Sequence, residues 1–522
     1  MYIEPNTNIR IYNSVPLDNT YNHTLYFSAI NIQQEYFSAA RAKYTLANNS
    51  YQRVMRGKIR VEKKADDLYD CNYLAFQNSN YGSKWFYAFI TGVEYINNIT
   101  SEITFEIDCM QTYMFDISIK QCYVEREHSL TDEVGDNIID EPIEIGDLTC
   151  NAQSTTSHFD SYTAVIATTY DVDTQDTADA SYTGGLFTGV KYVYGLVDTP
   201  AQVTALSQWL KACVSANKAE SIVSIFLMPT DFKPDPANPS APRVQVARVQ
   251  KNSDIHGYVP KNKKLLTYPY NFLGVECGNA SAVYRYEWFK GGDDYCDFEM
   301  VCGMSCNPEI ALVPEAYNGV GATEFNYLEK LVMKDFPQVA WSADSYEMWL
   351  ATNGLSNTLQ FVSGGVTSVL SAAALMGGTV ASGGAALAGA GIIGGIMTSA
   401  HARSEEIVAQ NKSPQSKGVS SGTVDVATRT KAFYFKQMQV TLENAKIIDD
   451  FFSMYGYSCH RIKVPNISSR PHWNYVKTRG CVAVGSAPSD EIRKVCSIYD
   501  KGITFWKSAE EVGNYSLNNA PT

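Results

Sequence analysis

Alternating apolar and polar positions dominate the first hundred or so residues. Glu102–Asp108, written EITFEID, places an apolar side chain at every second position, which is the period of a half-buried strand. The runs Trp85–Ile90 and Val93–Ile96 add aromatic and branched residues, and the pair Asn97-Asn98 has the chemistry of a turn before the next strand. The pattern predicts a β-meander or part of a barrel.

The middle of the chain mixes two periods. Ala164–Thr168, Val190–Leu196 and Ser221–Met228 have the composition of strands, whereas Val203–Val214 follows a Thr-Pro helix start signal. These elements predict a small α/β unit. The proline-rich residues 229–242 then predict a linker or long loop, and strand-forming aromatic residues return over positions 265–313.

The last hundred residues return to a regular pattern. Thr441–Tyr455 repeats apolar residues at helical spacing and is followed by Gly456, a fitting helix end. The apolar face of this predicted helix consists of Leu442, Ala445, Ile448, Phe452 and Tyr455. Strand-like composition follows at Tyr475–Val484 and Gly502–Trp506.

These periods predict a mixed α/β fold that is mostly β. A chain of 522 residues has room for two to four domains. We expect a β-rich domain built from both chain ends, a smaller α/β middle domain and an apolar inserted loop. The predicted boundaries are 1–130 for the N-terminal β-rich part, 131–260 for the α/β middle, 261–347 for a further β-rich segment, 348–424 for the glycine-rich apolar loop with its flexible flank, and 425–522 for the C-terminal return.

The stretch Gly364–Ala400 follows neither period. It uses only Gly, Ala, Ser, Thr, Val, Leu, Ile and Met, and it holds ten glycines, eight of them in four adjacent pairs. Each glycine costs about 1 kcal/mol relative to alanine in a helix interior. A pair of soluble core helices is therefore a poor interpretation of this stretch.

A membrane-crossing interpretation of the same stretch meets a length limit. Its glycine-poor arms, Val366–Met376 and Ala385–Met397, would be helices of roughly 17 to 20 Å at ~1.5 Å per residue, shorter than the ~30 Å hydrocarbon layer. An extended arm of ~18 residues crosses that layer only if neighbouring copies satisfy its backbone hydrogen bonds. Three interpretations remain, a core helix pair, a transmembrane hairpin and an apolar loop hidden until it meets a membrane, and the third is favoured in an oligomer.

The membrane-active hypothesis names particular residues within this stretch. They share small or apolar side chains that carry no charge. They are Gly364, Gly365, Val366, Leu370, Leu375, Met376, Gly377, Gly378, Val380, Gly383, Gly384, Leu387, Gly389, Gly391, Ile392, Ile393, Gly394, Gly395, Ile396 and Met397.

A dinucleotide-binding pattern occurs inside the stretch and is set aside. Gly389, Gly391 and Gly394 spell G-x-G-x-x-G. No strand-like run precedes them, and the next acids, Glu405 and Glu406, come too early for the usual ribose-binding position. We therefore expect no cofactor.

Charge and cysteine spacing exclude further classes of protein. The net charge of −13 argues against tight wrapping of nucleic acid, although an acidic wall suits DNA that must pass without sticking. The first residues lack the apolar core of a signal peptide. None of the twelve cysteines forms C-x-x-C, and neither Cys302 with Cys306 nor Cys459 with its histidine neighbours gives a zinc-like set, so buried free thiols are favoured and no metal is expected.

Candidate catalytic residues do not form a recognisable set. His128 lies near Glu125 and Glu127 in an acid-rich stretch, Glu125–Asp147, that we interpret as a solvated connection between domains. The neighbouring carboxylates Asp293-Asp294 suit a solvated loop better than a glycosidase. Without a nucleophile elbow, metal-binding helix or phosphate loop, the sequence predicts no catalytic residue.

Longer strings at both ends of the chain carry a resemblance to a known family. The N-terminal part contains YGSKWFYAFITGVEY, FEIDCMQTYMFD and YVEREH within Tyr81–His128. The C-terminal part contains YGYSCHRIKVPN, NYVKTRGC, GITFW and GNYS, with LLTYPY at Leu265–Tyr270 as a weaker central match. Together these strings resemble the distal tail-tube, or tail knob, proteins of small short-tailed phages that infect Bacillus, of the phi-twenty-nine type.

The resemblance implies a non-enzymatic virion protein at the tip of the tail, assembled in the host cytoplasm. It implies a hexamer that contacts other tail proteins and forms a tube through which double-stranded DNA leaves. It also implies that Gly364–Ala400 plugs the lumen and later forms a pore in the host cytoplasmic membrane. Two alternatives stay open: a cell-wall-degrading tail enzyme, and a receptor-binding adhesin in which the apolar stretch is only core.

Overall fold

The computed structural model describes most of the chain outside the apolar stretch. The described residues are 6–49, 57–78, 84–156, 159–169, 191–196, 221–232, 243–278, 280–290, 294–303, 308–334, 338–339 and 431–521, with the pair 177–178 and several single residues, Phe336 among them. The chain divides into two compact units. The first comprises Met1–Asp147, Asp254–Tyr270 and Val440–Thr522, and the second comprises Leu148–Ser253 and Asn271–Gln439.

The first unit contains residues from both ends of the chain. Its helices are α1 (Ile30–Tyr36), α2 (Cys109–Tyr113), α7 (Leu442–Tyr455) and α8 (Ser489–Lys501). Its strands are β1 (Thr7–Asn13), β2 (His23–Leu25), β3 (Tyr44–Asn49), β4 (Lys58–Val61), β5 (Cys71–Asn78), β6 (Trp85–Asn97), β7 (Thr100–Ile107), β8 (Ile117–Ile119), β9 (Cys122–Glu127), β23 (Tyr457–Lys463), β24 (Trp473–Arg479), β25 (Ala483–Gly485) and β26 (Ile503–Trp506).

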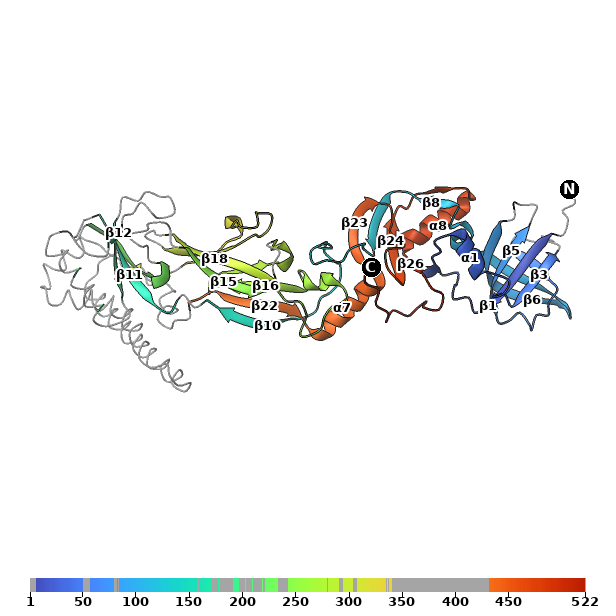
Figure 1. Ribbon diagram of the computed structural model, residues 1–522, viewed down its shortest axis with the longest axis horizontal. Coiled ribbons are helices and arrows are strands. Elements are labelled where there is room, and N and C mark those ends of the chain that lie inside the picture. Colours follow the sequence, from blue (N-terminus) through green and yellow to red (C-terminus); the bar gives the residue numbers. More distant parts are fainter. Residues whose placement is uncertain are drawn as a thin grey trace, which may run out of the picture. The chain divides into compact units, whose positions relative to one another are not determined.

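Three sheets organise these strands. Their orders are β3-β1-β5-β6-β7-β4, β2-β26-β24-β9-β23 and β25-β8. In the second of these, β26 pairs in parallel with β2 and antiparallel with β24, so the red C-terminal strands join a sheet with N-terminal ones (Figure 1). Residues from the two chain ends therefore lie in one β-rich unit.

The hairpin of β6 and β7 follows the predicted alternation. Ile103 and Phe105 are buried, and Ile103 lies opposite Val93 in the antiparallel register. The two apolar runs read from the sequence form one continuous strand of 13 residues. The hairpin closes at the pair Asn97 and Thr100, which confirms the predicted turn.

The helix α7 confirms the predicted C-terminal helix. The Thr441 hydroxyl accepts a hydrogen bond from the Asn444 N–H, and Gly456 ends the helix with a φ of 64°. The central residues of the predicted apolar face are buried, whereas Leu442 and Tyr455, at the two ends, are each 38% exposed. Buried Asp449 was not part of that face. Its carboxylate accepts hydrogen bonds from a loop of the chain's middle, at residues 258–262.

Three described helices were absent from the sequence-based prediction. The signals for α8 were present, since acids occupy its first turn and Lys501 its last turn. Its buried side chains, Val495, Ile498 and Tyr499, pack into the aromatic core around Trp473. Helices α1 and α2 have only 7 and 5 residues, too few to show a helical period.

The second unit is built from strands in the part that the structure describes. They are β10 (Leu148–Thr155), β11 (Tyr162–Thr168), β12 (Thr177–Ala178), β13 (Lys191–Leu196), β14 (Ile222–Pro229), β15 (Arg243–Gln250), β16 (Asn271–Glu276), β17 (Ser281–Tyr284), β18 (Tyr295–Gly303), β19 (Glu309–Pro314), β20 (Leu331–Met333), β21 (Gln338–Val339) and β22 (Tyr434–Val440). The sheet orders are β10-β22-β16-β17, β12-β13-β11-β14-β21 and β15-β18-β19-β20.

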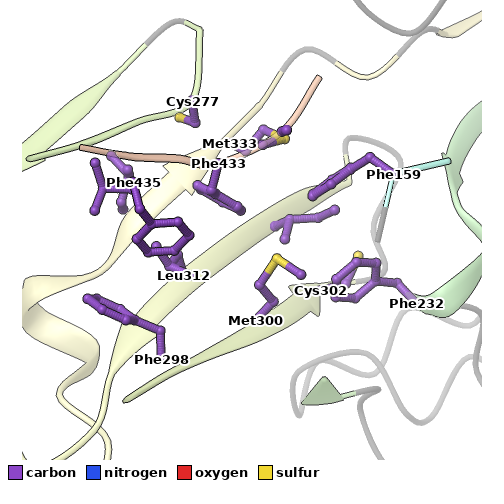
Figure 2. Close-up of a cluster of buried hydrophobic side chains, with 14 of the residues drawn as sticks. Phe159, Phe232, Cys277, Phe298, Met300, Cys302, Leu312, Met333, Phe433 and Phe435 are labelled. Carbon is purple, nitrogen blue, oxygen red and sulfur yellow. The ribbon is translucent and has the colours of Figure 1, made fainter. Parts of the chain in front are cut away.

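These strands confirm the β elements predicted for the middle of the chain. The predicted helix Val203–Val214 lies almost entirely outside the described residues, as do positions 233–242 of the proline-rich segment. Strands outnumber helices in the two units as described, and the prediction of a mostly β, mixed α/β fold is confirmed. Phenylalanines, methionines and cysteines from several strands fill the core of the second unit (Figure 2).

Most of residues 129–147 in the acid-rich stretch are exposed or half-buried, as the composition predicts, but two acidic side chains among them are buried. Glu141 has a fully buried side chain that accepts hydrogen bonds from Lys264, Arg126 and the Ser458 N–H. Asp132 is also buried and accepts a hydrogen bond from the Tyr457 hydroxyl at 2.6 Å. The prediction was wrong for these two residues because most of their partners, namely Lys264, Tyr457 and Ser458, come from distant parts of the sequence.

Candidate functional site: the base of the apolar segment

The residues predicted to act on membranes, all within Gly364–Met397, lie outside the described residues. The structure does describe the positions where the chain leaves the fold before them and returns after them. We call these positions the base. It comprises Met333, Lys334, Phe336 and Val339 on the outgoing side, and residues 431–433 on the returning side.

The outgoing side of the base is fixed by strand pairing and by the core. Met333 ends β20, which pairs with β19, and both Met333 and Phe336 are buried in the core of the second unit. In β21, Val339 lies opposite Ile225 of β14. The chain therefore remains held by the sheet as far as Val339.

The returning side is fixed in the same core. Phe433 is fully buried, its N–H donates to the Thr156 hydroxyl at 3.2 Å, and its carbonyl accepts from the Thr156 N–H at 3.1 Å. Phe435 lies opposite Val275 where β22 pairs with β16. Figure 2 shows the side chains of Met333, Phe433 and Phe435 in this core.

Lys431 joins the two sides of the base directly. Its Nζ donates a hydrogen bond of 2.6 Å to the carbonyl of Lys334, which lies 97 residues earlier. The same Nζ is 4.5 Å from the centre of the Phe336 ring. A charge-assisted hydrogen bond and a cation–π contact on a buried side chain hold the chain's exit and return points together. The chain therefore leaves the second unit and returns to it at two positions that are bonded to each other.

The residues of the base make hydrogen bonds and core contacts that attach the chain to the second unit. Outside it, His128 is a buried neutral ring, since its Nδ1 accepts from the Tyr475 N–H at 2.8 Å and its Nε2 lies 3.1 Å from the Ser453 carbonyl. Burial, together with the positive charge of Arg470, lowers the pKa of His128 to about 3. This histidine is positioned as a structural group between α7 and β24.

The described part of the chain contains neither a metal-binding cluster nor a membrane-spanning helix. Within them, no three or more His, Cys, Asp and Glu side chains are grouped so as to hold a metal ion. No described helix combines the length and the apolar character needed to cross a bilayer. Among the cysteines that the structure describes, six are buried, which agrees with the interpretation as core thiols.

The sequence-based reasoning missed the residues of the base. A signal for the returning side existed, because Phe433 and Phe435 alternate with polar or half-buried neighbours in the strand period. The bond between Lys431 and Lys334 had no local signal, since it depends on two strands that the sequence separates by the whole apolar segment.

Comparison with known proteins defines the class of this protein. Residues 5–120 match the family of the caudoviral major tail protein N-terminus, so the fold belongs with phage tail proteins. Residues 240–520, more than half of the chain, match the C-terminal domain of the tail knob protein gp9 of Bacillus phage phi29. The chain belongs to this family of tail knob proteins, as the resemblance of its sequence strings predicted.

Individual relatives match this chain over almost its full length. The chain is 25% identical to the tail knob protein gp9 of Bacillus phage B103 and 24% identical to that of Bacillus phage phi29, in each case over 98% of both chains. The solved structure of the bacteriophage C1 tail knob protein, gp12, has a TM-score of 0.58 and 13% identity, and the match covers 98% of this chain and 99% of that one. The protein is a structural component of the phage tail and hence of the virion.

Proposed function

We propose that this chain forms a hexameric ring that is the distal tube and knob of a short-tailed phage tail. In this proposal the ring contacts other tail proteins, is assembled in the host cytoplasm and lets double-stranded DNA pass. Gly364–Ala400 plugs the lumen first and later forms a pore in the host cytoplasmic membrane. The protein carries out no enzymatic reaction.

The observation that carries the proposal is the closed base. The charge-free stretch Gly364–Ala400 lies between two points of the chain that share one buried core, with Lys431 and Lys334 joined across them. An insertion anchored in this way can exchange its surroundings while the strands at its root stay paired. That property suits a segment that must leave one apolar environment for another.

The energetics support the exchange. Apolar side chains that pack together inside a ring are removed from water, which stabilises them by about 25 cal/mol for each Å² buried. A bilayer offers a similar environment, so a membrane shifts the population towards the inserted state if it contacts the segment better than the plug does. The net charge of −13 supports DNA passage, because acidic groups do not displace the counterions of DNA.

Vesicle leakage tests the proposed pore. Full-length protein and a variant lacking residues 364–400 are added to vesicles loaded with a self-quenching dye. We expect the full-length chain to release the dye and the deletion variant to release at least tenfold less. The double substitution Ile392→Asp and Ile393→Asp should lower release in the same way, because two charges in a membrane segment each cost about 3 kcal/mol.

A matched control keeps the leakage test specific. Ile462→Asp places a charge at an exposed apolar position of β23, outside the segment, and should leave release unchanged. Equal leakage from the deletion variant would refute the pore and favour the adhesin with a purely structural core. Hydrolysis of purified cell wall in a muramidase or amidase assay would instead support the tail enzyme.

A further inference from the structure

Three cysteines from separate elements lie near one another in the first unit. Cys122 begins β9, Cys481 follows β24, and Cys496 lies on α8. The thiols of Cys496 and Cys122 lie close enough to that of Cys481 to affect its pKa. A disulfide joins two cysteines whose Cα atoms lie within about 7 Å of each other and whose side chains point together.

Backbone contacts hold Cys481 against the helix that carries Cys496. The Cys481 N–H donates to the Asp500 carboxylate at 3.0 Å, and the Thr478 hydroxyl donates to the same oxygen at 2.8 Å. Asp500 lies four residues after Cys496 on α8, so the two side chains project from one face of the helix. The face that binds the backbone of Cys481 therefore also presents the Cys496 thiol to it.

The other side of Cys481 is held by a small sheet. Strand β25 pairs with β8, and the Lys120 N–H donates to the Val482 carbonyl at 2.8 Å. Cys481 thus lies on a short connection between β24 and β25, which is bonded to α8 on one side and joined to the β25–β8 pair on the other. Cys481 and Cys496 are partly exposed, whereas Cys122 is buried, so a small solute can reach the first two.

We propose that Cys481 and Cys496 form an oxidation site, in which a peroxide converts the thiol pair into a disulfide that fastens the β24–β25 connection to α8. The Cys496 sulfur attacks one oxygen of hydrogen peroxide, the O–O bond breaks, and water leaves a sulfenic acid behind. The Cys481 sulfur then attacks the sulfenic sulfur, which forms the S–S bond and releases a second water. Two thiols lose two electrons, and the peroxide is reduced to two waters.

The order of these steps follows from the surroundings of Cys481. Burial and the neighbouring thiols of Cys496 and Cys122 raise the pKa of Cys481 well above its ordinary value. Cys481 therefore stays protonated at neutral pH and is slow to attack a peroxide by itself, because the thiolate is the nucleophile. It reacts once an activated sulfur lies beside it.

The location of the protein gives this site a use. Thiols stay reduced in bacterial cytoplasm and are oxidised outside the cell, and a virion protein meets both conditions in turn. The disulfide would form in released particles and make this part of the first unit more resistant to unfolding. This timing rests on the proposed assembly in the host cytoplasm, but the chemistry of the pair does not.

Peptide mapping of the full-length chain tests the site. The protein is purified with a reductant, the reductant is removed, and a few equivalents of hydrogen peroxide are added. The remaining thiols are then blocked with a thiol reagent, and the protein is digested without reduction. We expect a linked peptide containing Cys481 and Cys496, lighter than the two separate peptides by two hydrogens. The oxidised protein should melt about 5 to 10 °C above the reduced one, as expected for a loop of about 15 residues closed by a disulfide.

Matched variants make the result specific. Cys496→Ser should lose both the linked peptide and the rise in melting temperature, and Cys150→Ser, which removes an exposed thiol of the second unit, should keep both. Recovery of Cys481 as a blocked thiol, or linked to Cys122, would overturn the proposal. The wild-type peptide map decides the question even if a variant fails to fold, and it is independent of vesicle leakage.

Discussion

A single buried carboxylate, Asp108, combines two roles in the first unit. Its Oδ1 accepts hydrogen bonds from the N–H groups of Met110 and Gln111 and so caps α2, while its Oδ2 accepts from the Tyr73 hydroxyl at 2.9 Å. Burial raises the pKa of Asp108 from 3.8 to about 6, although these hydrogen bonds favour the charged form. The desolvation of the carboxylate outweighs its three partners.

The raised pKa predicts an unusual pH dependence. Because folded Asp108 holds its proton more tightly than the unfolded chain does, its contribution to stability is present below pH 4 and is lost as the pH rises to about 6. The loss is roughly 3 kcal/mol for a shift of about two pKa units. Asp108→Asn keeps the cap but cannot titrate. The unfolding free energy of the wild type minus that of this variant, measured in urea, should fall by about 2 kcal/mol between pH 4 and pH 6.

The comparison with the variant isolates this carboxylate from the other titrating groups. Burial lowers the pKa of His128 to about 3, so this histidine destabilises both proteins equally as the pH falls below 6.5. A free-energy difference that stays constant between pH 4 and pH 7 would contradict the assignment to Asp108.

At the scale of elements, the end of α7 and the end of β9 lie in very close contact. Gly456 has a φ of 64°, and a Cβ added there would lie 2.3 Å from the carbonyl oxygen of Glu127, in β9. Gly480 has a similar φ of 68°, but a Cβ there would meet nothing within 4 Å. The two glycines therefore have similar φ angles and differ in the space around them.

This pair of glycines gives a matched test. Gly480→Ala should lower the free energy of unfolding by about 1 to 2 kcal/mol, the strain of a left-handed alanine. Gly456→Ala should lower it by about 2 to 5 kcal/mol, since the clash with the β9 backbone adds an overpacking penalty of about 1 to 3 kcal/mol. Urea unfolding measures both. Equal losses of unfolding free energy in the two variants would show that the β9 backbone moves aside at no measurable cost.

At the scale of the whole molecule, Glu141 connects three distant parts of the chain. Arg126 belongs to β9, Lys264 to the middle of the sequence, and Ser458 to β23. The Glu141 side chain is fully buried and that of Lys264 is 2% exposed. Burial opposes the charged form, but the positive charges of Lys264 and Arg126 outweigh it and lower the pKa of Glu141.

Removing this charge should destabilise the first unit strongly. Glu141→Gln leaves the buried cation of Lys264 without its counter-charge, and we expect a loss of about 3 to 5 kcal/mol in the free energy of unfolding at pH 7. The control Glu94→Gln alters an exposed carboxylate 3.4 Å from Lys58 and should cost less than about 1 kcal/mol. Denaturant titration distinguishes the two. Similar small losses of unfolding free energy in both variants would mean that the negative charge of Glu141 is not needed to stabilise the buried cations.

Acid should weaken the Glu141 network, in contrast to the carboxylate of Asp108. The pKa of Glu141 is lowered on folding, so its contribution is complete above pH 4.5 and is lost as the pH falls through the folded pKa. The Glu141→Gln variant should therefore lack this part of the acid sensitivity of the wild type.

The sequence by itself determined the local elements and the kind of protein. Alternation defined β7, helical spacing defined α7 between Thr441 and Gly456, and the long aromatic strings led to the tail knob family. These features are readable because a strand or helix imposes its period on neighbouring residues of one segment. The apolar stretch Gly364–Ala400 is equally evident from composition, and its proposed function remains a prediction.

Only the tertiary structure decided which segments meet. The pairing of β2 with β26, the burial of Glu141 in a stretch that looked solvated, the bond from Lys431 to Lys334 and the meeting of Cys481 with Cys496 all join separate elements. Periodicity reports the environment along one face of one segment and carries no information about its partner. A buried charge or thiol acquires its role from groups that the fold brings from elsewhere in the chain.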